Sequence, residues 1–142
     1  MPYGEFVIKS TGEIVLLAGG SGITAFTSFL SQLTANSAQK VYLAYGARKA
    51  GLLIYHNLID HCVKRGCHLQ PGYYVEKGQI DPFLERETRK GRLSVSDWWG
   101  NIVDLSASTF YLSGPPDMIK TISCDLLDRG MDKDAIRVDA WE

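Results

Sequence analysis

Residues 13–25 read EIVLLAGGSGITA, a continuous apolar run that stops at a glycine-rich turn. An apolar run without polar alternation is typical of a strand that is buried on both faces of a parallel sheet. The residues after the turn recur at helical spacing: Ile23, Phe26, Thr27, Leu30 and Leu33. This stretch therefore predicts a strand, a tight turn and a helix over residues 23–34, whose apolar stripe packs on the sheet.

The rest of the chain continues the alternation of strand and helix. We expect further strands over residues 41–45, 72–76, 109–113 and 136–140. We expect helices over residues 51–64, 81–90 and 96–103 and between Pro116 and Gly130, the last with Ile119, Ile122, Leu126 and Leu127 on its inner face. The alternation predicts an α/β fold, an open doubly wound parallel sheet of about five strands in the order 3-2-1-4-5, Rossmann-like.

The composition restricts the classes of function. With 142 residues, 45% of them hydrophobic and 22% charged, the chain is expected to form one compact domain. Fifteen Lys and Arg against sixteen Asp and Glu give a formal charge of −1, which predicts neither nucleic-acid nor anionic-membrane binding. No apolar run approaches the roughly 20 residues of a membrane span, and no signal-peptide pattern is present. Three irregularly spaced cysteines favour a reducing compartment, so we expect a cytoplasmic protein.

The first turn, Gly20-Ser21-Gly22-Ile23-Thr24-Ala25, fits the G-x-G-x-x-G/A pattern of dinucleotide-binding proteins, with a strand before it and a helix after it. Glycines let a pyrophosphate approach the backbone, and helix N–H groups face the anion. A side chain at Gly22 is accordingly expected to fill the space of the pyrophosphate. The alternative is a tight turn whose glycines serve only strand–helix packing. No Gly-Lys-Ser/Thr follows, which disfavours a P-loop phosphotransferase.

A second strand-to-helix turn reads Ser113-Gly114-Pro115-Pro116-Asp117-Met118. Ligands of open doubly wound sheets bind outside the carboxyl ends of the strands, where the strand order reverses. With the expected strand order, this turn faces the first turn across that point. The alternative is a helix start with proline in its first turn, with Ser113 as a capping residue.

These segments resemble the NAD(P)-binding module of the ferredoxin-NADP reductase superfamily. The first turn, from Gly19 to Ala25, is similar to the family's pyrophosphate loop, although Ala25 stands where proline is usual. The second turn resembles the family's Cys-Gly-Pro-x-x-Met sequence, with Ser113 in the cysteine position. Tyr45-Gly46-Ala47-Arg48 and Asp139-Ala140-Trp141 resemble two further segments, in the same order along the chain.

The resemblance implies NAD or NADP as the cofactor and hydride transfer to a flavin, FAD or FMN, held elsewhere. It implies that Ser113 and Trp141 lie at the reacting nicotinamide and that other residues bind the nucleotide: Gly20, Ser21, Gly22, Ile23, Thr24, Gly46, Arg48, Gly114, Pro115, Pro116 and Met118. Arg48 is a candidate for binding a 2′-phosphate, but an arginine at a sheet edge is more often simply solvated. Trp141 is equally consistent with a packing role.

Residues 2–6, Pro-Tyr-Gly-Glu-Phe, resemble the sequence that closes the family's flavin-binding barrel. Residues 1–8 are therefore expected to be the end of such a barrel and a linker, and residues 9–142 the NAD(P)-binding domain. The family's Arg-x-Tyr-Ser/Thr flavin motif is absent, so the isolated chain is expected to carry no flavin and to be inactive.

The alternative function is an accessory nucleotide-binding or electron-transfer module without its own flavin that works with a partner chain. His61, Cys62, Cys67 and His68 lie close in sequence but straddle a predicted helix end, so we expect buried structural thiols and no metal site.

Overall fold

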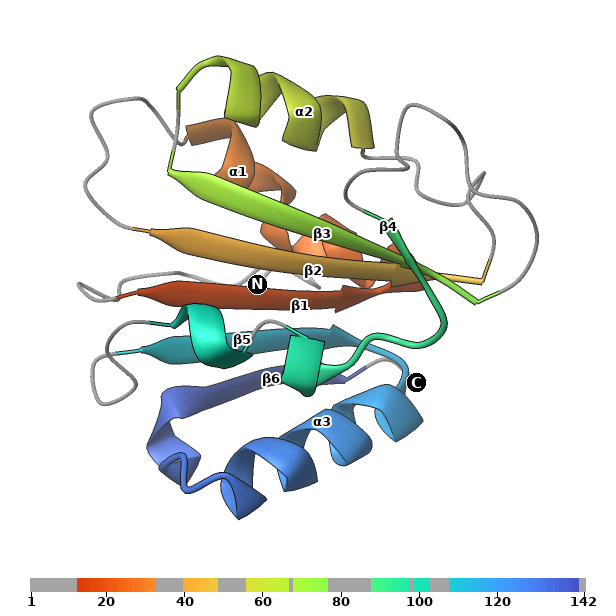
Figure 1. Cartoon of the computed structure of the whole chain (residues 1–142), viewed down its shortest axis with the longest axis vertical. Coiled ribbons are helices and arrows are strands. Elements are labelled where there is room, and N and C mark those ends of the chain that lie inside the picture. Colours follow the sequence, from red (N-terminus) through yellow and green to blue (C-terminus); the bar gives the residue numbers. More distant parts are fainter. Residues whose placement is uncertain are drawn as a thin grey trace.

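The computed structural model describes residues 13–32, 40–48, 56–66, 68–76, 88–97, 99–102 and 108–140. These residues form a parallel sheet of six strands in the order β4-β3-β2-β1-β5-β6 (Figure 1). The strands are β1 (Ile14–Gly19), β2 (Val41–Ala47), β3 (Leu69–Val75), β4 (Thr88–Lys90), β5 (Thr109–Gly114) and β6 (Ile136–Ala140). The five expected strands and their order are confirmed, and β4 adds a sixth strand at the edge beside β3.

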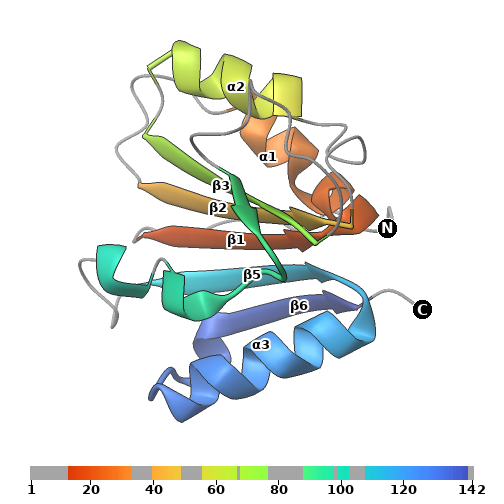
Figure 2. The same ribbon diagram turned by 45° about the vertical axis from the view of Figure 1, so that its right-hand side comes forward.

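Helices cover both faces of the sheet. They are α1 (Thr27–Gln32), α2 (His56–Lys64) and α3 (Pro116–Asp128), with short 3₁₀ turns at 20–26, 95–97, 99–101 and 133–135. Helices α1 and α2 pack on one face, whereas α3 packs on the other beside β5 and β6 (Figure 2). None of the helices in the described part of the chain is long and apolar enough to cross a bilayer.

Strand β1 is the centre of both cores. Ile14, Leu16 and Ala18 face the layer of α1 and α2, and Val15 and Leu17 face the layer of α3. All five side chains are fully buried, and complete burial of each large aliphatic side chain contributes about 1.5–3 kcal/mol. The uninterrupted apolar run is therefore explained by burial on both faces.

The segments with weak periodicity differ from the sequence prediction. Residues 88–90, expected in a helix, form β4, because their backbone pairs with the open edge of β3 in the register Tyr73 with Thr88. In the described part of the helix expected over 96–103, the structure has two 3₁₀ turns, and residues 98 and 103 lie outside the described residues. Residues 81–87 lie outside the described residues.

Two helices also differ in detail. The helix after the first turn begins as a 3₁₀ turn over Gly20–Phe26 and becomes α-helical at Thr27. Leu127, expected on the inner face of α3, is 46% exposed, so that prediction is wrong. Ile119, Ile122 and Leu126 already fill the stripe that the sheet covers, and Leu127 lies one position beyond it.

Tyr42 generates a prediction about stability at alkaline pH. Burial raises the pKa of its phenol above the ordinary 10.0, and the Glu13 carboxylate raises it further by its charge and by accepting a hydrogen bond. The stabilisation of the neutral phenol is present below pH 10 and is lost as the pH rises through the higher pKa of the folded state.

Tyr42→Phe should lower the free energy of unfolding at pH 7 by about 1–2 kcal/mol through loss of the bond to Glu13. It should also make the loss of stability above pH 10 less steep. Urea unfolding of both proteins at pH 7, 9 and 10.5 measures the difference, and a constant gap between the two curves would contradict the expectation.

Candidate nucleotide-binding site

The two predicted turns meet at the carboxyl edge of the sheet. Ala18 of β1 lies opposite Ser113 of β5, and Gly19 lies opposite Gly46 of β2. The chain leaves β1 toward α1 on one face and leaves β5 toward α3 on the other, so the strand order reverses between these strands. This is the switch point at which open α/β sheets bind ligands. The expected apposition of the turns is confirmed.

Gly22 lies directly against the main chain at the end of β5. A Cβ atom at Gly22 would overlap the carbonyl group of Ser113 and lie 2.9 Å from the nitrogen of Gly114. Glycine is therefore required here for contact between the two turns. The expectation that a side chain at Gly22 would fill the space of the pyrophosphate overlooks this contact with the protein's own main chain.

Gly20 is required for a different reason. Its φ is +58°, a left-handed conformation that most side chains adopt only with strain, and among the residues that the structure describes, apart from its chain neighbours, no heavy atom lies within 4 Å of a Cβ built there. Gly20 is also exposed. The space beside the first turn is therefore open at Gly20, where a ligand could approach the backbone, and closed at Gly22.

The side chain of Met118 holds the two turns together from the other side. A Cβ at Gly19 would overlap the Met118 sulfur and lie 3.3 Å from Pro115 Cδ. A Cβ at Gly114 would lie 2.9 Å from Met118 Cε and 3.2 Å from the nitrogen and oxygen of Gly19. Gly19 and Gly114 thus let the strand ends approach each other and let a thioether cover both.

Ser113 carries an unusual hydroxyl. The residue is fully buried, and Ser113 Oγ has no hydrogen-bond partner in the described part of the chain. A buried hydroxyl without a partner costs about 1–3 kcal/mol, and such groups occur where a ligand supplies the partner. Pro116 begins α3 as predicted, but Ser113 does not cap it, because α3 has Pro115 at its cap and no side-chain cap bond.

The remaining predicted site residues differ in how far they are exposed at this edge of the sheet. The side chain of Ile23 is fully buried in the core, so its backbone is the part available to a ligand. Thr24 is half-buried, and its carbonyl oxygen accepts a bond from Thr27 Oγ1 at 3.1 Å. Pro115 and Pro116 are exposed at the edge. The side chain of Ser21 and the whole of Trp141 lie outside the description.

Arg48 is exposed just after β2, and the structure adds an ion pair beside it that the sequence did not predict. The Glu76 amide donates to the Ala47 carbonyl at 3.1 Å, which brings the end of β3 next to the end of β2. Arg92 Nε lies 3.1 Å from Glu76 Oε1. This pair was missed because residues 81–90 were predicted to be a helix, which would not bring Arg92 to this edge.

Gly46 lies at the same edge without a steric need for glycine. A Cβ there would lie 3.6 Å from Leu93 Cβ and 3.8 Å from Tyr74 Cβ, which are ordinary contacts.

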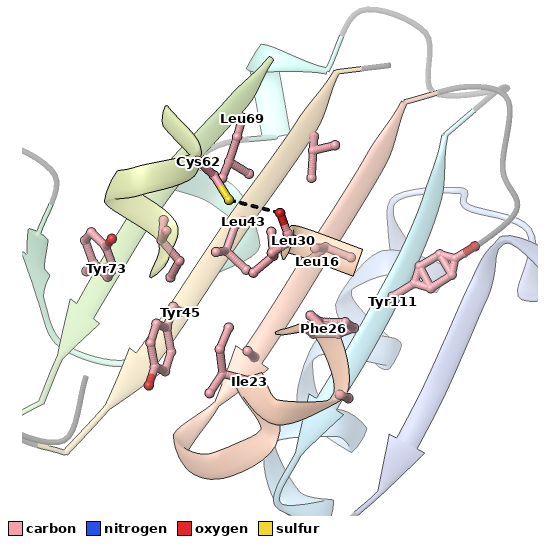
Figure 3. Packing of buried hydrophobic residues seen from close by; sticks show 14 of the residues in the cluster. Leu16, Ile23, Phe26, Leu30, Leu43, Tyr45, Cys62, Leu69, Tyr73 and Tyr111 are labelled. Carbon is pink, nitrogen blue, oxygen red and sulfur yellow. Dashed lines mark hydrogen bonds between the residues drawn. The ribbon is translucent and has the colours of Figure 1, made fainter. Parts of the chain in front are cut away.

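The cysteine and histidine cluster does not assemble into a metal site among the residues described. Cys62 is buried and donates its thiol hydrogen to the Leu30 carbonyl at 3.0 Å (Figure 3). His61 and His68 are exposed, and Cys67 lies outside the described ranges. No group of three or more His, Cys, Asp or Glu side chains gathers in the ranges that the structure covers. The role of Cys62 is therefore structural.

Gly22→Ala tests the contact between the turns. The new methyl group must displace the Ser113 carbonyl, so we expect the free energy of unfolding to fall by about 1–3 kcal/mol. Gly46→Ala is the matched control, because its methyl group enters ordinary contact distance and should change stability by less than about 1 kcal/mol. Denaturant unfolding measures both, and equal stability of the two variants would refute the steric requirement at Gly22.

Comparison with known proteins shows the family and the fold of the chain. Residues 16–123 match the family model described as the oxidoreductase NAD-binding domain. The chain is 30% identical over 141 residues to oxidoreductase NAD-binding domain-containing protein 1 of Danio rerio, with 91% of this chain and 52% of that protein covered. It is 31% identical to the sulfhydrogenase 2 subunit gamma of Pyrococcus furiosus, with 92% and 49% covered. The chain thus spans about half the length of these relatives.

A solved structure shows the same fold. The flavohem-like FAD/NAD binding domain of nitric oxide dioxygenase from Vibrio cholerae superposes with a TM-score of 0.75 at 17% identity. The alignment covers 96% of this chain and 54% of that one.

Proposed function

Because the chain belongs to the oxidoreductase NAD-binding domain family, we propose that it is the part of a flavoprotein reductase that presents NADH or NADPH to a flavin. The observation that carries this proposal is the buried Ser113 hydroxyl without a partner at the switch point of the sheet. A nicotinamide carboxamide offers both a donor and an acceptor, so it can complete the hydrogen bonding of this hydroxyl. The Ser113 hydroxyl thus fits a nicotinamide nucleotide as the ligand of this site.

The pyrophosphate is proposed to lie over the first turn. Gly20 leaves open space beside the backbone, and the first N–H groups of the helical segment that follows have no partner within that segment. The pyrophosphate would therefore contact the main chain of Gly20–Thr24. The adenosine would extend toward Gly46 and the exposed Arg48, where the Glu76–Arg92 pair also lies.

The contribution of the protein to the reaction is alignment. When bound, the reduced nicotinamide supplies the hydride that the flavin accepts. Transfer between two cofactors depends on their distance and orientation more than on a proton donor or acceptor. Ser113 is proposed to hold the nicotinamide in place, and Trp141 to cover the reacting face. Pro115, Pro116 and Gly114 form the adjoining wall.

The flavin is proposed to lie in a separate domain. The relatives are about twice as long as this chain, and the solved neighbour is described as binding FAD as well as NAD. Residues 1–8 are proposed to be the end of that flavin-binding barrel and a linker, and residues 9–142 the nucleotide domain. The isolated chain should then bind nucleotide but neither flavin nor electron acceptor.

A partner chain could supply the flavin instead. The similar protein of Pyrococcus furiosus is named as a subunit, which favours an accessory module within a larger complex. Nucleotide binding at the same edge is common to both proposals.

The charge of the ligand at Gly20 can be tested with Gly20→Asp and Gly20→Asn. Asn and Asp both tolerate the left-handed conformation, and the open space accepts either side chain. The two variants have nearly the same shape and differ in charge. We expect the aspartate to weaken NADH or NADPH binding roughly tenfold relative to the asparagine at low salt, because it faces the pyrophosphate.

Isothermal titration at two salt concentrations measures this difference, which should shrink as screening increases. Equal affinities of the two variants at low salt would exclude the pyrophosphate from this turn.

Ser113→Ala separates the role of the hydroxyl in binding from a role in folding. The hydroxyl has no partner in the described structure, so its removal should leave the melting temperature unchanged or raise it. Affinity for NADH should fall roughly threefold to tenfold through loss of one hydrogen bond. Affinity for ADP-ribose, which lacks the nicotinamide, should not change. An equal loss for both ligands would contradict the position of Ser113 at the nicotinamide.

A further inference from the structure

The Met118 side chain packs between the two glycine turns, a contact within the protein that does not involve the proposed nucleotide. Its sulfur and methyl group lie against Gly19 and Gly114, which end the two strands of the proposed site. Neither glycine has room for even one additional carbon atom on that side. The thioether therefore packs directly against both strand ends, and an oxygen atom added to the sulfur on that side would have to displace either the methionine side chain or the strand ends.

The chemistry of this side chain makes enlargement possible. Met118 is half-buried, so part of it is accessible to small solutes. A peroxide oxidises a thioether by two electrons, forming a sulfur–oxygen bond, and is itself reduced to water or an alcohol. The sulfoxide is bulkier, polar and chiral, and methionine sulfoxide reductases reverse its formation.

We propose that Met118 is an oxidation-sensitive contact between the two glycine turns, and that its conversion to the sulfoxide by peroxide separates the turns. Oxidation would displace Gly19 or Gly114 and so disturb the apposition of Ser113 with the first turn. The consequence for nucleotide affinity rests on the proposed function. The consequence for stability rests on the packing alone.

The chain contains a matched control. Of its three methionines, Met118 and Met131 are both half-buried against the core on the α3 face. Met131 follows the carboxyl end of α3 at Asp128, whereas the glycine turns lie at the other end of this helix. The Met131 amide donates a hydrogen bond to the Leu126 carbonyl. Met118→Leu and Met131→Leu each remove one oxidisable sulfur and preserve the approximate volume.

The experiment compares each protein with itself before and after treatment with hydrogen peroxide. Dithiothreitol reverses cysteine disulfides and sulfenic acids but does not reduce methionine sulfoxide, and mass spectrometry records oxidation at each methionine and any irreversible oxidation of cysteine. We expect the wild type and Met131→Leu to lose roughly tenfold in NADH or NADPH affinity, about 1.4 kcal/mol. Their melting temperatures should fall by about 3 °C. Met118→Leu should keep its untreated values, and methionine sulfoxide reductases should restore the wild type.

The result that overturns the proposal is an equal loss in Met118→Leu, or a Met118 sulfoxide that changes neither affinity nor melting temperature. Resistance of Met118 to peroxide while Met131 is oxidised would also overturn it. If the untreated protein binds no nucleotide, the proposed function fails, and the melting temperatures alone decide whether Met118 is the sensitive contact.

Discussion

The close approach of Gly22 to the main chain of Ser113 is the contact on which the arrangement of the site depends. It joins the turn after the central strand to the end of the neighbouring strand without any side chain between them. Gly19, Gly114 and the Met118 thioether complete the same junction from the other side. The junction therefore depends on the absence of side-chain volume, which makes it intolerant of even small substitutions.

The junction also explains how a buried polar group is held at the edge of an apolar core. Ser113 lies two residues after Tyr111 in β5, so both side chains are on the same face of the sheet, with Ser113 nearer the carboxyl end of the strand. The strand is fixed by its pairing with β1 and β6, so the hydroxyl cannot turn away toward water. The fold thus contains an unpaired buried group at the position proposed to contact the nicotinamide, and such groups are common at functional sites.

The sequence predicted the parts of the structure whose local pattern and tertiary environment agree. Burial of β1 on both faces produces an apolar run that is visible without the structure, and glycines mark both turns. Strand β4 was not predictable, because Thr88-Arg89-Lys90 carries no strand pattern and pairs only through its backbone with β3. The contact of Gly22 with Ser113 joins residues far apart in sequence, and the pattern G-x-G-x-x-A does not show whether a glycine faces a ligand or another strand.

The short helix α1 has a consequence for the order of folding. Its described α-helical part has six residues, few for a helix that is stable alone, and its Leu30 carbonyl accepts hydrogen bonds from Cys62 and Arg65, which lie in and just after α2. The end of α1 is thus satisfied by a segment about thirty residues later in the chain, across a loop whose closure costs entropy. The helix that follows the first turn is therefore stabilised by α2, and we expect the turn to become ordered late in folding, after α2 has docked on the core beneath it.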